Sequence, residues 1–96
     1  MDAGNRTSEQ IRQIVQDIIQ ERFGYPLEYV DVFADEDSAG EAILRIEVGH
    51  PWRHEPVEPD LAYGLPRQVR DALEQQGETR FPFIRHHFHD NQAVAS

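Results

Sequence analysis

The alternation of apolar and polar residues from 42 to 48 is the feature that most constrains the fold of this chain. Every second residue is apolar, and Arg45 and Glu47 stand between them, with Ile43 as the one exception. The apolar series is Ala42, Leu44, Ile46 and Val48. This period of two predicts a β-strand with one face against a core and the other face open to water or a partner.

An amphipathic helix is predicted before this strand. Thr7 with Gln10 three residues later fits a capping box, and Gly24 followed by Pro26 fits a helix that ends near Phe23. The apolar residues in between recur at the spacing of a single helical face: Ile11, Ile14, Val15, Ile18, Ile19 and Phe23. We therefore expect a core helix here.

The remaining elements follow from strand and turn signals. Residues 27–34 read as a first strand, and the acidic residues 35–40 read as the turn of an antiparallel hairpin. After a long segment rich in proline and histidine, Pro66 is expected to open a second helix that Gly77 ends. Residues 81–88 are predicted to form a third strand at a sheet edge, because they include a proline near the start.

The element order α-β-β-α-β predicts an α+β fold, a two-layer α/β sandwich with a three-stranded sheet and two helices on one face. We expect one domain over residues 7–90, with disordered ends at residues 1–6 and 91–96. The order is similar to that of KH-type RNA-binding domains and BolA-like proteins. This resemblance implies architecture alone, because the Gly-x-x-Gly clamp of KH domains is absent from the sequence.

Composition narrows the functional classes. The formal net charge is −9, and the chain has neither cysteine nor lysine. The absence of cysteine excludes disulfides, thiol nucleophiles and thiolate metal sites, and it favours a reducing, cytoplasmic location. No apolar run is long enough to span a bilayer, so we expect no membrane association. The acidic charge and the lack of a basic run argue against nucleic-acid binding.

Histidines follow the ends of the second and third predicted strands. A strand, a crossover helix and a return strand normally give parallel pairing, so both strand ends should meet at one rim of the sheet. The residues expected there are His50, His54, His87, His89 and Asp90. Imidazole and carboxylate are suitable ligands for zinc, nickel or iron(II), so this cluster is a candidate divalent-metal site. The alternatives are ordinary surface histidines, a hydrogen-bonded and partly buried His86, or a pH-responsive cluster.

The open face of the predicted sheet is the second candidate site. The third strand is phased with Ile84, His86 and Phe88 toward the core, although Phe81 and Phe83 compete for that face. The open face then carries Tyr29, Phe33, Ile43, Arg45, Glu47, Phe83 and Arg85. Aromatic residues with arginine are typical of protein interfaces and of single-stranded RNA platforms. Trp52 is either a lid on the core or a contact anchor.

No glycine-rich phosphate loop, nucleophile elbow or His-Glu-x-x-His motif is present, so we expect no enzymatic activity and no cofactor. Our leading hypothesis is an acidic protein-interaction module that binds itself or another protein through the open sheet face and the loop around Trp52. The second hypothesis is a metal-binding protein or metal-dependent enzyme that uses the histidines. A third is binding of a small ligand or single-stranded RNA on the sheet.

Overall fold

The computed structural model describes residues 7–52 and 59–89. These residues form the predicted α+β fold with the predicted element order. The predicted tails at 1–6 and 91–96, together with His54 and Asp90, lie outside the described residues. The elements are α1 (Glu9–Phe23), β1 (Tyr29–Glu36), β2 (Ala42–Gly49), the 3-10 turn η2 (Pro59–Ala62), α2 (Leu65–Glu74) and β3 (Phe81–His87).

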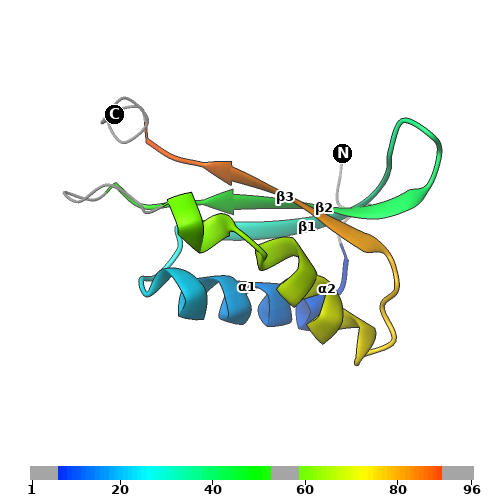
Figure 1. The fold of residues 1–96 in the computed structure, drawn as a ribbon, viewed down its shortest axis with the longest axis horizontal. Helices are drawn as coiled ribbons and strands as arrows, with labels where there is room; N and C mark the ends of the chain where they lie inside the picture. Colours follow the sequence, from blue (N-terminus) through cyan, green and yellow to red (C-terminus); the bar gives the residue numbers. More distant parts are fainter. Residues whose placement is uncertain (1–6, 53–58, 90–96) are drawn as a thin grey trace.

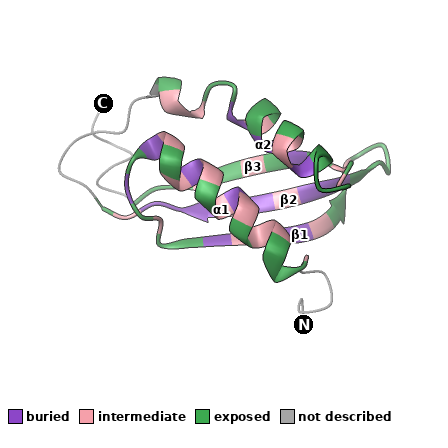
Figure 2. Cartoon of the chain, turned by 90° about the horizontal axis from the view of Figure 1, so that it is seen from below, coloured by how far each residue is buried: buried purple, intermediate pink, exposed green. Residues whose placement is uncertain are grey.

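The three strands form one mixed sheet in the order β1-β2-β3. β1 pairs antiparallel with β2, and β3 pairs parallel with β2, as the crossover through α2 predicts. Both helices lie on the same side of this sheet, and within residues 7–52 and 59–89 no helix lies on its other side (Figure 1). Seen from below, the helices lie in front of the sheet, and the buried residues of β2 run through its centre (Figure 2).

The core lies between the central strand and the two helices. Leu44, Ile46 and Val48 of β2 are fully buried, as their alternation predicts. The helices contribute Val15, Ile19, Phe23, Leu65, Val69 and Leu73. Each large apolar side chain removed from water contributes about 1.5–3 kcal/mol, so this layer supplies most of the driving force for folding. Among the described residues, no helix is long and apolar enough to cross a membrane.

The start of α1 corrects one expectation. Ser8, and not Thr7, is the N-cap: the Ser8 Oγ accepts a hydrogen bond from the backbone N–H of Ile11 at 3.3 Å. Thr7 instead donates to the backbone carbonyl of Val32 through its N–H, at 3.0 Å, and through its hydroxyl, at 3.4 Å. The residue before the helix therefore contacts the outer edge of β1.

Two further boundaries differ from the sequence analysis. β1 begins at Tyr29 and not at Leu27, whose backbone N–H is bound by the side chain of Gln20 at 3.0 Å. α2 begins one residue before Pro66, and Gly64 takes the capping position with a φ of 77°. That positive φ is readily adopted only by glycine, which explains the sharp turn into α2.

The phase of β3 follows the first of the two predicted alternatives. Pro82 is buried, and Ile84 and His86 are partly buried on the helix side. The residues of the competing phase lie on the open side and are exposed: Phe81, Phe83, Arg85 and His87. Phe88, which was expected in the core, lies just past the strand and is 37% exposed.

Candidate interaction surface

A ladder of alternating charges crosses the open face of the sheet. The Arg45 guanidinium donates to Asp35 on β1 at 2.9 Å and to Glu47 two residues along its own strand, also at 2.9 Å. Glu47 in turn pairs with the imidazole of His87 on β3. These contacts join all three strands, and each of the two carboxylates, Asp35 and Glu47, is paired with a basic side chain.

The pKa directions of the carboxyl groups agree with this arrangement. The backbone N–H of Glu36, followed by the Arg45 guanidinium, lowers the pKa of Asp35. Burial alone would raise the pKa of Glu47, but hydrogen bonds from His87 and Arg45 outweigh it and lower that pKa. Both carboxylates therefore stay ionised at neutral pH.

The same arginine changes the expected binding surface. Its guanidinium lies 4.4 Å from the centre of the Phe33 ring, a cation–π contact, and Phe33 is only 8% exposed. Ile43 is 9% exposed. Phe33 and Ile43 therefore lie on the open side of the sheet, as predicted, but little of either side chain is exposed there.

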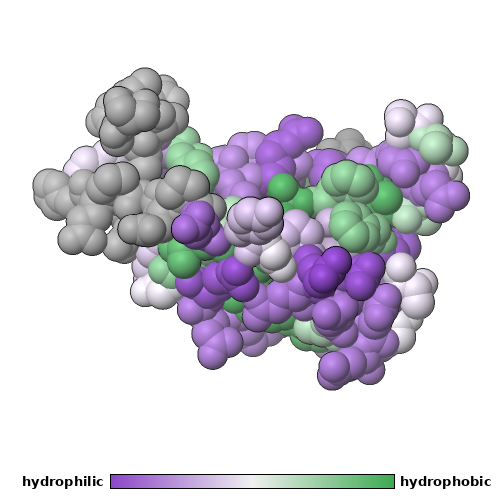
Figure 3. Space-filling view, in the orientation of Figure 1, coloured by the Kyte–Doolittle hydropathy of each residue, from purple (hydrophilic) through white to green (hydrophobic). Residues whose placement is uncertain are grey.

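The exposed aromatic residues of this face gather on β3. Phe81 and Phe83 are 41% and 50% exposed, and their rings contact each other edge to face with centroids 5.4 Å apart. Figure 3 shows apolar surface where β3 begins, bordered by hydrophilic surface. Tyr29 on β1 is 43% exposed and lies beside the ring of His87. We call Tyr29, Phe81, Phe83, Arg85 and the ion-paired Arg45 the open-face patch.

A hollow of about 470 Å³ lies within this patch. The β1–β2 hairpin bends away from the helices toward the open side, so the sheet is concave there (Figure 1). Arg45 and Arg85 line the hollow together with Phe83, and the hairpin turn adds Asp37 and Ser38. The sequence predicted only a solvent-exposed turn here. The turn lines the hollow because the hairpin bends, and no sequence motif indicates that bend.

The histidine rim is arranged differently from the predicted metal site. The backbone N–H of His50 donates to the carbonyl of His87 at 2.9 Å, so the two segments do meet at one rim. Their side chains diverge. The His50 imidazole is buried on the helix side, whereas His87 pairs with Glu47 on the open face, and His89 pairs with Glu28 at 3.1 Å.

Across residues 7–52 and 59–89, no group of three or more histidine, aspartate or glutamate side chains could hold a metal ion. The described histidines therefore do not form the expected chelating cluster. His54 and Asp90, the other two residues of that cluster, fall outside these ranges.

The buried His50 forms a polar chain that the sequence analysis did not foresee. The Tyr25 hydroxyl lies 2.8 Å from its Nδ1, and Nδ1 of His86 lies 2.8 Å from its Nε2. Phe23 and Phe88 contact the His50 ring, the latter stacked at 4.3 Å. The expected partly buried, hydrogen-bonded His86 is confirmed. Tyr25 was missed because it stands between Gly24 and Pro26, in a segment that reads only as a helix end.

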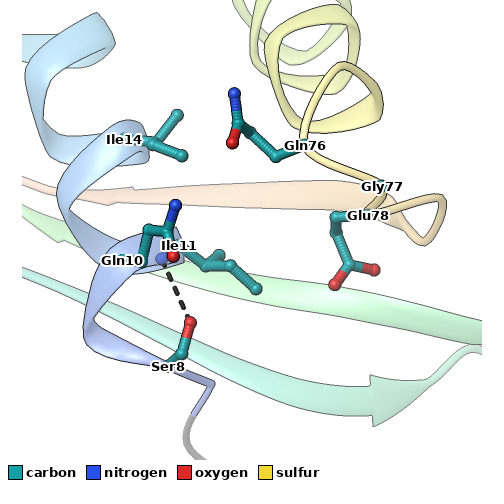
Figure 4. Close-up of a pocket in the computed structure, with 7 residues that line it drawn as sticks. All are labelled: Ser8, Gln10, Ile11, Ile14, Gln76, Gly77 and Glu78. Carbon is teal, nitrogen blue, oxygen red and sulfur yellow. Dashed lines mark hydrogen bonds between the residues drawn. The ribbon is translucent and has the colours of Figure 1, made fainter.

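Trp52 and a hollow beside α1 are two further features of the surface. Trp52 follows β2 and is 45% exposed, so it is not a buried lid on the core. A second hollow, of about 210 Å³, lies between the start of α1 and the turn after α2 (Figure 4). Its acidic group, Glu78, already pairs with Arg80 at 2.8 Å, and the cap hydrogen bond occupies Ser8. This hollow offers no free charged group to a ligand.

Comparison of the chain with protein-family models, curated proteins and solved structures found no match.

Proposed function

We propose that this protein is an interaction module that binds a protein partner through the open-face patch. The observation that carries the proposal is the pair of exposed aromatic side chains, Phe81 and Phe83, on the side of the sheet opposite α1 and α2. Aromatic residues and arginine are enriched at protein interfaces, where a few desolvated anchors supply most of the binding free energy. The hollow beside Phe83 gives such a partner a concave seat.

The charge distribution supports a protein partner over a nucleic acid. The net charge is −9, and Arg45, one of the two arginines lining the hollow, is ion-paired to Asp35 and Glu47. A phosphate backbone would have to compete with those carboxylates while approaching an acidic molecule. An uncharged aromatic side chain of a protein partner neither competes with these carboxylates nor is repelled by the net charge.

Photo-crosslinking tests the proposal. A benzophenone amino acid replaces Phe83 in one variant and Tyr63, in the turn before α2, in the control. Tyr63 is 79% exposed, so it reports on random collisions of an accessible aromatic residue. We expect irradiation in the producing cells to give protein adducts from position 83 and none from position 63. Equal adduct yields at both positions, or no adduct from position 83, would contradict the proposal.

A further inference from the structure

The two outer edges of the sheet differ in their accessibility. At β1, Thr7 already occupies the outward-facing carbonyl of Val32, in the middle of that edge. At β3, the carbonyl of His87 accepts from the N–H of His50, the residue just past β2, so it faces that neighbouring segment, and backbone groups along a strand face alternate sides. The N–H and C=O groups of Ile84 and His86 therefore point away from β2, and in the described part of the chain no further strand follows β3.

The position of Pro82 agrees with this alternation. Its missing N–H falls on the outer edge and costs no hydrogen bond to β2, which is where a proline is tolerated in a strand. The free edge of β3 is continuous with the aromatic pair of the open-face patch, because Phe81 and Phe83 lie on the same strand.

The same strand is where two copies of this acidic chain meet with least repulsion. Residues 79–89 contain no aspartate or glutamate and include Arg80 and Arg85, although the whole chain carries a charge of −9. The nearest carboxylate of the adjacent strand, Glu47, is already paired with His87 and Arg45. An edge without acids on an acidic molecule is suited to a second copy of itself.

We infer that the partner is a second copy of this chain, whose β3 pairs antiparallel with β3 of the first across a two-fold axis at Ile84. This inference rests on the proposed function and names the partner for the same surface. In this register the two Ile84 residues exchange their N–H···O=C bonds, and Phe83 lies opposite Arg85 of the second copy. Both copies thereby gain a cross-strand contact between an aromatic ring and a guanidinium.

Neighbouring registers are less favourable. An axis at Arg85 puts two arginines opposite each other, and an axis at His86 puts Arg85 opposite a histidine. An axis at Phe83 puts each Ile84 opposite Pro82, which has no N–H, so no residue pair at the centre of the paired segment exchanges two hydrogen bonds. With the axis at Ile84 the missing N–H of Pro82 falls opposite His86, toward the end of the paired segment, and the central Ile84 pair keeps both hydrogen bonds. Of these registers, the one with its axis at Ile84 alone has a central residue pair that exchanges two edge hydrogen bonds and, beside it, two contacts between Phe83 and Arg85 on the open face.

Disulfide trapping tests the register, because the chain has no cysteine of its own. In the inferred dimer, residues 83 and 85 form a non-hydrogen-bonded pair with Cα atoms about 4.5 Å apart, within the disulfide range. Identical positions are offset by two residues along the strands, beyond the roughly 7 Å that a disulfide bridges. We therefore expect a mixture of Phe83→Cys and Arg85→Cys proteins to oxidise to the mixed dimer, with little linkage of either protein alone.

The matched control is a mixture of Tyr63→Cys and Arg85→Cys, which should link only at the rate of random collision. The register would be overturned if the mixed and the self-linked disulfide dimers formed in random proportions, or if either variant linked to itself faster than to the other. Mass spectrometry of the photo-crosslinked adducts separates the two proposals. Adducts of Phe83-substituted chain with itself support the inference, adducts with a different protein overturn it while leaving the proposed function in place, and no adduct overturns both.

Sedimentation velocity adds an independent readout. Because both copies carry a charge of −9, added salt screens their repulsion, and we expect the dimer fraction of the unmodified chain to rise between about 0.05 and 0.5 M salt. We expect the Arg85→Glu variant to have a dimer association constant at least about tenfold lower. Arg67→Glu makes the same change of charge on α2, and we expect it to lower the association constant much less. A sedimenting monomer at every salt and protein concentration would overturn the inference.

Discussion

Nε2 of His50 lies 2.8 Å from Nδ1 of His86, which places two imidazoles in direct hydrogen-bond contact on the buried side of the sheet. The Tyr25 hydroxyl, 2.8 Å from Nδ1 of His50, extends this contact into a chain of three hydrogen-bonding side chains. If that hydroxyl donates, Nε2–H of His50 donates to His86, and both imidazoles are neutral. With the hydroxyl as the donor, a proton added to Nδ1 of either imidazole breaks one of these two hydrogen bonds.

This contact predicts a pH dependence of stability. Burial, followed by repulsion from His86 and His87, lowers the pKa of His50 from 6.5 to about 4. Burial likewise lowers the pKa of His86. Between these two pH values the histidines of the unfolded chain bind protons and those of the folded chain do not. The stability that depends on the neutral imidazoles is therefore fully present above pH 6.5 and is lost as the pH falls toward about 4. We expect the free energy of unfolding to fall by about 3 kcal/mol across this window.

Urea unfolding at a series of pH values measures this loss, and histidine NMR titration assigns it. Carboxyl groups such as Glu47 and Glu78 contribute at lower pH, because hydrogen bonds and ion pairs hold their pKa below 4.5. An imidazole of His50 that titrates near pH 6.5 would show that its burial does not exclude the proton, and the prediction would fail.

Removal of the Tyr25 hydroxyl should destabilise the fold. Tyr25→Phe keeps the ring, which is 8% exposed, but leaves Nδ1 of His50 without its hydrogen-bond partner. A buried polar group that loses its partner costs about 1–3 kcal/mol. The control is Tyr63→Phe at an exposed position, where we expect a change within about 0.5 kcal/mol. Equal unfolding free energies for the two variants would contradict the role given to this hydroxyl.

A close contact between strands predicts a second stability effect. Tyr29 lies opposite Gly49 in the β1–β2 register, and a Cβ at Gly49 would overlap the Tyr29 ring. We expect Gly49→Ala to cost about 1–3 kcal/mol by displacing that ring. Because the cost arises from one contact, Gly49→Ala should cost much less in a Tyr29→Ala background. Additive effects in this double-mutant cycle, measured by urea unfolding, would disprove the contact.

The fold was predictable where one local pattern determines one outcome. The alternation from 42 to 48 fixed which side of β2 is buried, and the intervening helix fixed the parallel pairing of β3. The N-cap of α1 was not predictable, because Thr7 and Ser8 both offer a hydroxyl. Only the contact of Thr7 with Val32 leaves Ser8 as the cap.

The candidate site was predictable only in part. The sequence placed the histidine segments at one rim, but alternation sends the side chains of His86 and His87 to opposite faces. It also placed Phe33 on the open face, but no pattern indicates that Arg45 folds over its ring. Side-chain contacts between strands depend on register, which the sequence alone does not specify.

Amide hydrogen exchange at the edge of β3 tests the central claim most directly. In dilute protein, the N–H groups of Ile84 and His86 face solvent and should exchange rapidly, while those of Phe83 and Arg85, bonded to β2, should be protected. At high protein concentration we expect protection of Ile84 and His86 to rise with the dimer fraction while the other two stay unchanged. Rapid exchange of Ile84 and His86 at every concentration would contradict pairing of two copies through this edge.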